Sequence, residues 1–136
     1  MNLDIKLKEG IGEIRYDMPV EQVVALWGEA DEVESIDNAV DETTTVLHYG
    51  EEITLFFEGD NPTLSCIDIS AKECRLFGEQ VFEMTEKEIV KLIVGNNYFE
   101  QDVGNEDWGE RRVTFNEGNI DFYFSKGVLV SILIGK

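Results

Sequence analysis

The stretch GEIRYDMPVEQVVALW, residues 12–27, has a counterpart 66 positions later in GEQVFEMTEKEIVKLI, residues 78–93. Five positions are identical at this spacing, namely Gly12, Glu13, Met18, Val24 and Leu26 with their counterparts. After one inserted residue, the apolar run at 53–57 matches the run at 120–124. We therefore predict a single domain, residues 1–136, built of two repeats at about residues 11–75 and 77–136.

Each repeat is predicted to contain one helix of about ten residues. In the first, Pro19 suits the first turn of a helix and Gly28 its end. Between them the apolar side chains recur at helical spacing, at Val20, Val23, Val24 and Trp27. In the second, Thr85 and Glu88 have the spacing of a capping box, in which each side chain bonds to the other residue's backbone N–H.

Three strand-like runs follow each predicted helix, at 45–49, 52–58 and 63–70 and again at 111–116, 119–125 and 128–134. Short joints rich in Gly, Asp and Asn separate them, and such joints connect antiparallel neighbours. The predicted fold class is therefore α+β: two tandem helix-plus-three-stranded-antiparallel-meander units, with the helices packed on a largely antiparallel sheet.

The composition restricts the classes of partner. The chain carries 29 Asp and Glu against 11 Lys and Arg, a formal net charge of −18. No basic surface is available to neutralise phosphates, so we expect neither a nucleic acid nor an anionic membrane as partner. The beginning of the chain lacks the apolar core of a signal peptide, and two cysteines fit a reducing compartment. We therefore expect a cytoplasmic location.

The acidic residues are unevenly distributed. Residues 16–71 hold 14 acids and no Lys or Arg. The densest part, 29–42, is predicted to be a surface linker between the first helix and its first strand. Its seven carboxylates are candidate partner-binding residues: Glu29, Asp31, Glu32, Glu34, Asp37, Asp41 and Glu42. Three interpretations are open: a solvated surface that aids solubility, a face for a basic partner, or a calcium site.

The second linker, 96–111, adds Trp108, which we place in a loop. A tryptophan in a loop either anchors an interface or folds back onto the core. It completes the set of candidate partner-binding residues.

Familiar catalytic and ligand-binding motifs are missing from the sequence. It has no Gly-rich phosphate loop, no His-Glu-x-x-His zinc motif and no Gly-x-Ser-x-Gly nucleophile motif. The one histidine, His48, and the two cysteines, Cys66 and Cys74, lack the spacing of a zinc site. We expect a protein that is not an enzyme, with no catalytic residue, no cofactor and no bound metal. Chemistry based on carboxylates needs no motif and stays an alternative.

Residues 12–31 resemble a recurrent bacterial segment of entry strand, turn and helix that ends in a Leu-x-Gly-Glu-x-Asp exit, here 26–31. The segment occurs in the beta-lactamase inhibitor protein group, a tandem repeat of helix and antiparallel strands. It also occurs in the small outer-membrane-assembly lipoproteins, whose lipidated cysteine this chain lacks. The resemblance to the inhibitor group implies a protein-binding scaffold without catalysis.

Together these observations predict a non-catalytic, acidic protein-binding module. Its most concrete form is a stoichiometric inhibitor, such as an immunity protein against a basic nuclease toxin, which the acidic linker steers and Trp108 anchors. A small-ligand carrier or sensor that binds between the helices and the sheet is an alternative. A housekeeping domain whose acidity serves only solubility is another. The oligomeric state is left open.

Overall fold

The computed structural model describes residues 1–37 and 43–136. Its main element is an eight-stranded sheet with the order β4-β5-β6-β7-β12-β11-β10-β9, in which every neighbouring pair is antiparallel. The strands are β4 (Glu32–Asp37), β5 (Thr43–Tyr49), β6 (Ile53–Glu58), β7 (Thr63–Ile69), β9 (Gln101–Asn105), β10 (Arg111–Phe115), β11 (Ile120–Ser125) and β12 (Val128–Gly135).

A second sheet of four short strands has the order β3-β2-β1-β8. These strands are β1 (Asp4–Lys6), β2 (Gly10–Ile11), β3 (Ile14–Arg15) and β8 (Arg75–Leu76). Glycine is required at two positions of this sheet, Gly10 at the start of β2 and Gly12 directly after it. Both have positive φ, and a Cβ would clash with the carbonyl oxygen of Ile14 or Asn2 respectively.

The predicted fold class is wrong, because the protein is mostly β. Strands make up 47% of the structure and helices 18%. Two helices are present in the described part of the chain, α1 (Val20–Trp27) and α2 (Glu86–Gly95), with 3₁₀ turns at Val81–Glu83 and Asn116–Gly118. Both predicted linkers contain a strand, β4 and β9, and the second sheet was not predicted. Instead of two three-stranded units, each half of the chain contributes four strands to one continuous eight-stranded sheet.

The local signals for the two helices are confirmed. Helix α1 follows Pro19 and ends before Gly28. Helix α2 begins with the capping box, in which Thr85 Oγ1 accepts from the Glu88 N–H and Glu88 Oε1 accepts from the Thr85 N–H. Within the described residues, no helix is both long enough and apolar enough to cross a membrane.

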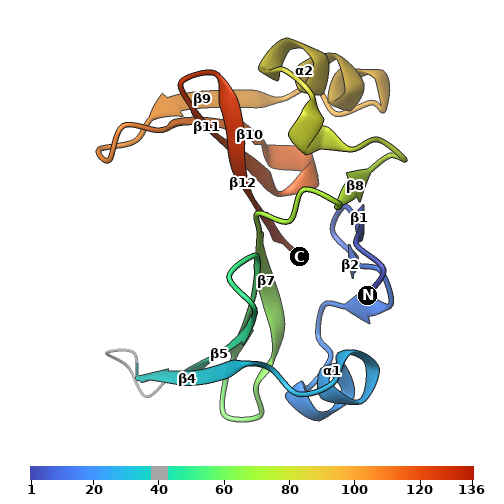
Figure 1. Cartoon of the computed structure of the whole chain (residues 1–136), viewed down its shortest axis with the longest axis vertical. Coiled ribbons are helices and arrows are strands. Elements are labelled where there is room, and N and C mark those ends of the chain that lie inside the picture. The colour runs from blue at the N-terminus through green and yellow to red at the C-terminus, as the bar shows by residue number, and fades with distance from the viewer. Residues whose placement is uncertain (38–42) are drawn as a thin grey trace.

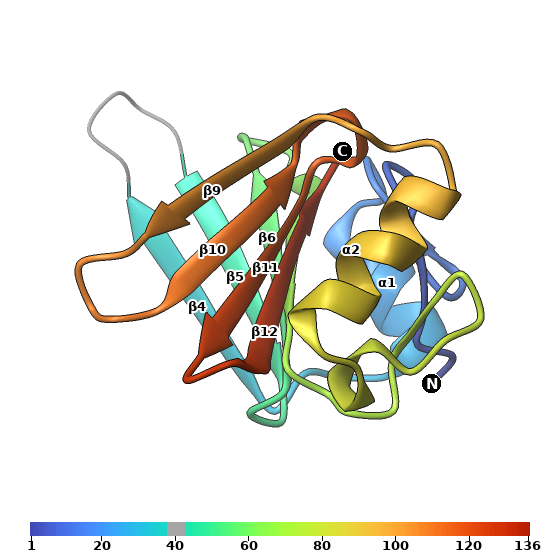
Figure 2. The same ribbon diagram turned by 90° about the horizontal axis from the view of Figure 1, so that it is seen from above.

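One face of the eight-stranded sheet is covered. Figures 1 and 2 show α1, α2 and the second sheet on the same side of it, while the β4-β5 and β9-β10 hairpins project toward the opposite side. The sheet residues on the covered face form one apolar cluster with the helices, and its largest fully buried side chains include Phe57, Phe115 and Phe122. Val23 of α1 and Ile89 and Ile93 of α2 are buried against this cluster.

The two halves of the eight-stranded sheet correspond strand for strand about the β7–β12 pair. In this pair Ile67 lies opposite Ile134 and Ile69 opposite Ile132. The β6–β7 register shifts at Phe56/Phe57, and the β11–β12 register shifts at Tyr123/Phe124, 67 positions later. Such bulges add local twist to a sheet. The two halves thus bend at matching places.

Candidate functional site

The candidate site lies on the uncovered face of the eight-stranded sheet, called the open face below. Side chains alternate between the two faces of a strand, so the residues opposite the core positions point to this face. From the strand registers they are Glu32, Glu34, Ile36, Thr44, Val46, His48, Thr54, Phe56, Glu58, Thr63, Cys66, Asp68, Ser131, Leu133, Val128, Asp121, Tyr123, Ser125, Arg112, Thr114, Asp102 and Gly104. Most are polar and half-buried or exposed, as expected for a sheet face in contact with solvent.

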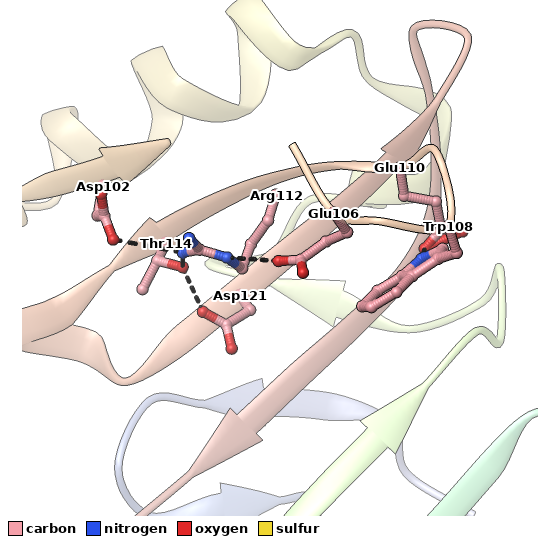
Figure 3. Close-up of polar contacts among 7 residues, drawn as sticks. All are labelled: Asp102, Glu106, Trp108, Glu110, Arg112, Thr114 and Asp121. Atoms are coloured by element: carbon pink, nitrogen blue, oxygen red, sulfur yellow. Dashed lines mark hydrogen bonds and ion pairs between the residues drawn. The ribbon is translucent and has the colours of Figure 1, made fainter. Parts of the chain in front are cut away.

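Carboxylates outnumber the cationic groups on the open face. Among the residues that the described strands present there, Arg112 is the one arginine or lysine, and it already has partners. Its Nε donates to Glu106 Oε1 at 2.9 Å, and its Nη1 lies 3.5 Å from Asp102 Oδ2 and donates to Thr114 Oγ1. Thr114 in turn donates to Asp121 (Figure 3). The hydrogen bond to Glu106 is the main cause of the raised pKa of Arg112.

Trp108 is exposed but held in place. It lies in the turn between β9 and β10 and is 65% exposed. Its ring packs on Tyr123 of β11, with centroids 6.3 Å apart, and its Nε1 donates to Glu110 Oε1 at 2.8 Å. The turn is closed by the hydrogen bond from Glu106 N to Glu110 O at 2.7 Å. An exposed indole with a fixed position loses little conformational freedom on binding, so it can anchor a partner.

A hollow of about 270 Å³ opens beside this tryptophan, called the Trp108 hollow below. Its lining comes from β7, β11, β12 and the β9-β10 turn: Asp68, Trp108, Glu110, Tyr123, Ser131 and Leu133. Burial, and secondarily the charge of Glu110, raises the pKa of Asp68. Among the described residues, neither Asp68 nor Glu110 forms an ion pair. The hollow therefore combines an aromatic wall with uncompensated negative charge.

The predicted acidic residues are divided between several environments. Glu32 and Glu34 of β4 lie on the open face, whereas Asp37 points to the other side of that strand. Asp31 precedes the strand, and its Oδ2 accepts from the Gly50 N–H at 2.6 Å, so it stabilises the β5-β6 turn. Glu29 is exposed between α1 and β4. The last two candidates, Asp41 and Glu42, lie outside the described residues.

Trp108 and the acidic strand are not adjacent. Five strand steps separate β4 from β11, on which Trp108 packs, and at about 4.8 Å per step this is roughly 24 Å along the sheet. Because Glu32, Glu34 and Trp108 all belong to the open face, they can contact one large partner together but not one small molecule.

His48 lies between these acids and has structural partners. Its Nε2 is 2.7 Å from Glu34 Oε1, and its Nδ1 is 3.4 Å from Thr54 Oγ1. Glu32, Glu34 and His48 each offer one atom that could bind a metal ion, and these three atoms lie within 4.8 Å of one another. Imidazole and carboxylate groups suit a divalent transition metal, so these are the residues of the described chain that could hold one.

Neither cysteine has the environment of a reactive thiol. Cys74 is fully buried, and burial raises its pKa to about 12. Arg75 does not activate it, since its Nη1 donates to the Gly78 carbonyl instead. Cys66 is half-buried on the open face, and burial raises its pKa to about 11.

Several site residues were not singled out in the sequence: Asp68, Glu110, Arg112, Asp121 and Tyr123. A signal was available for the strand residues among them. In 111–115 and 120–124 polar residues alternate with apolar ones, which is the pattern of a strand with one solvated face.

Comparison with known proteins adds little. No protein-family model and no curated protein matches the chain. Among solved structures, it is similar to an extracellular protein containing a SCP domain from Bacillus anthracis, with 13% sequence identity and a TM-score of 0.49. The match covers 95% of this chain but 49% of the other, so the chain spans about half the length of that protein. A similarity of this degree supports no inference about function.

Proposed function

We propose that the protein is a non-catalytic, acidic protein-binding module of the cytoplasm that binds a basic protein on its open face. The observation that carries the proposal is the composition of this face. It presents Glu32, Glu34, Glu58, Asp68 and Asp121 from strands β4, β6, β7 and β11, and its one arginine among the described strands, Arg112, is already bonded to carboxylates. A surface with this excess of one charge attracts a partner of the opposite charge and repels others.

The size of the open face fits such an interaction. Specific interfaces bury about 800 Å² per partner. Eight strands about 4.8 Å apart span roughly 34 Å, and six residues along a strand span roughly 20 Å. The projected area is thus on the order of 700 Å², before side chains add to it.

A stoichiometric inhibitor of a basic enzyme is the concrete form of the proposal. Nucleases bind the phosphate backbone of the nucleic acid with lysine and arginine, so their substrate sites carry positive charge. A rigid face of carboxylates can occupy such a site in place of the phosphates. An immunity protein against a nuclease toxin would work in this way.

The alternative of a small-ligand carrier that binds between the helices and the sheet has less support. None of four hollows among the described residues has a lining residue from α1 or α2. The helix residues that face the sheet, such as Val23, Ile89 and Ile93, are 0 to 1% exposed. The space between helices and sheet is therefore filled by side chains.

The test compares two variants with the same net charge. Glu32→Gln/Glu34→Gln/Glu58→Gln removes three charges from the open face, and Glu13→Gln/Glu21→Gln/Glu79→Gln removes three exposed charges from the opposite side. Each raises the formal net charge from −18 to −15. Immobilised wild type and variants are exposed to a low-salt extract of the native host.

The proposal expects a basic protein that is retained by the wild type and the second variant but weakly by the first. After purification, that protein must bind the wild type in a 1:1 complex by calorimetry. If no basic protein is retained, or if both variants lose it equally, the acidity serves only solubility and the proposal is overturned.

A further inference from the structure

We propose that the Trp108 hollow receives an arginine side chain of the protein partner, whose guanidinium group stacks on the exposed indole of Trp108 and bonds to the carboxylates of Asp68 and Glu110. This inference deepens the proposed function and rests on it, since the arginine belongs to the basic protein that docks on the open face.

The shape of the hollow suits one inserted side chain. Its volume of about 270 Å³ is too small for a folded element and sufficient for a single long side chain. It lies over the central strands of the sheet, with walls from β7, β12 and β11 and the β9-β10 turn. Walls on paired strands keep their positions when a partner binds, which reduces the entropic cost of association.

The Trp108 hollow carries negative charge that a bound cation would neutralise. Asp68 lies half-buried in the sheet, and its carboxylate has neither a hydrogen bond from a side chain nor an ion pair among the described residues. Glu110 uses Oε1 to hold the indole, which leaves Oε2 available for a partner. Arg112 does not compensate these groups, because it is bonded to Glu106 and Thr114 (Figure 3). A cation that enters the hollow therefore meets two carboxylates that form no ion pair within the described residues.

The aromatic wall favours arginine over lysine. A guanidinium group is planar, stacks on aromatic faces and donates several hydrogen bonds in one plane. Trp108 packs one face on Tyr123 and is 65% exposed, so part of the indole surface is available to such a group. An ammonium group can satisfy the charge but not the stacking.

The experiment uses the two indole N–H signals of the chain, from Trp27 and Trp108, in ¹H–¹⁵N NMR spectra. Trp108→Phe identifies the signal of Trp108. The full chain is titrated at constant ionic strength with N-acetyl-arginine amide, with its neutral isostere N-acetyl-citrulline amide, and with N-acetyl-lysine amide. The expected result is a saturable shift of the Trp108 signal with arginine, a weaker effect with lysine, and at least tenfold weaker binding of citrulline.

Variants identify the groups responsible. Asp68→Asn and Glu110→Gln should each weaken arginine binding at least threefold, and Glu110→Gln keeps an oxygen that can accept from the indole N–H. The matched control Glu51→Gln/Glu52→Gln removes two charges from a different hollow, at the β5-β6 turn, and should leave binding unchanged. A citrulline response equal to that of arginine, no saturable shift, or equal loss in the control overturns the inference.

The two proposals fail in different ways. If arginine does not bind but a basic protein is retained through Glu32, Glu34 and Glu58, the inference falls and the proposed function stands. If arginine binds but no basic protein is retained, the hollow is a cation site without the proposed docking function.

Discussion

Replacing Asp68 by asparagine should stabilise the folded protein and at the same time weaken its binding of arginine. Burial and the neighbouring Glu110 raise the pKa of the Asp68 carboxyl group. The folded state then holds the proton more tightly than the unfolded state, so this group lowers the stability as the pH rises through the folded pKa. Asp68→Asn should therefore raise the free energy of unfolding at pH 7, and its advantage should shrink toward pH 4.

Urea unfolding at both pH values measures this effect, with Glu51→Gln as an exposed control. A purely structural carboxylate would make the asparagine variant less stable at pH 7, and that result would contradict the role assigned to Asp68.

The two thiols should react slowly in the folded protein. Burial raises the pKa of Cys66 to about 11 and that of Cys74 to about 12, so both are protonated at pH 7.5. Modification by Ellman's reagent should be slow in buffer, slower for the fully buried Cys74 than for Cys66, and fast in 8 M urea. Single-cysteine variants separate the two rates, and labelling of native Cys74 at the rate of the unfolded chain would refute the expectation.

The raised pKa values of the two thiols also predict how the stability of the protein changes at alkaline pH. Above a pH of about 9 the unfolded chain ionises its thiols while the folded chain does not. The cysteines therefore favour unfolding as the pH rises toward the folded pKa. Cys74→Ala should flatten the fall of stability with pH over this range.

Single residues could be predicted from sequence where the signal is local. The sequence predicts Trp108 in a loop, but it does not decide between an interface anchor and a cap on the core. The structure shows that it packs on Tyr123 of the open face instead of the core. Tyr123 lies beside Trp108 because β10 pairs with β11 and because the β9-β10 turn folds over the sheet. A local sequence pattern predicts neither of these features.

At the scale of single elements, the capping box of α2 provides a quantitative test. Thr85→Ala removes the hydroxyl that accepts from the Glu88 N–H. Loss of such a cap costs about 1 kcal/mol. For a chain of this size we expect a melting temperature lower by roughly 3 °C. Thr85→Ser keeps the hydroxyl and should melt within 1 °C or so of the wild type, and equal melting of both variants would show that the cap contributes nothing.

Strands β4 and β9 show why one part of the fold was missed. In β4 the apolar residues Val33 and Ile36 are three positions apart, so they point to opposite faces and give no alternation. The remaining residues are three acids and a serine, which are poor strand formers. The strand exists because β5 offers a free edge, and charged residues at an edge oppose further pairing. Edge strands of this kind depend on their neighbour and not on their own sequence.

The strands between these edges were predictable because they carry their own signal. Residues 53–58, 63–69, 120–125 and 128–135 form strands within one or two residues of the predicted bounds. Apolar alternation and glycine-containing turns determine them locally. The order of the strands in the sheet could not be predicted in this way. It depends on the pairing of β7 with β12, which are separated by 60 residues or so of chain.

At the scale of the whole molecule, this β7–β12 pair joins the two halves of the sheet. Ile67 and Ile134 lie opposite each other in it and are 0 and 1% exposed. The core on the covered side is one apolar cluster with members from both halves. A continuous core makes the halves interdependent, so the chain should unfold in one cooperative transition.

Trp27 and Trp108 report on the two halves separately, because Trp27 packs on Tyr49 and Trp108 on Tyr123. In protein labelled with 5-fluorotryptophan, the two ¹⁹F signals should lose intensity at the same urea concentration. Ile67→Ala should cost about 2–5 kcal/mol and move both midpoints together, although residue 67 belongs to the first half. Val128→Ala, at an exposed position of β12, is the control and should move neither by a comparable amount. If Ile67→Ala lowered only the midpoint of Trp27, the halves would be separate folding units, and the open face would not be the rigid surface on which the binding proposals depend.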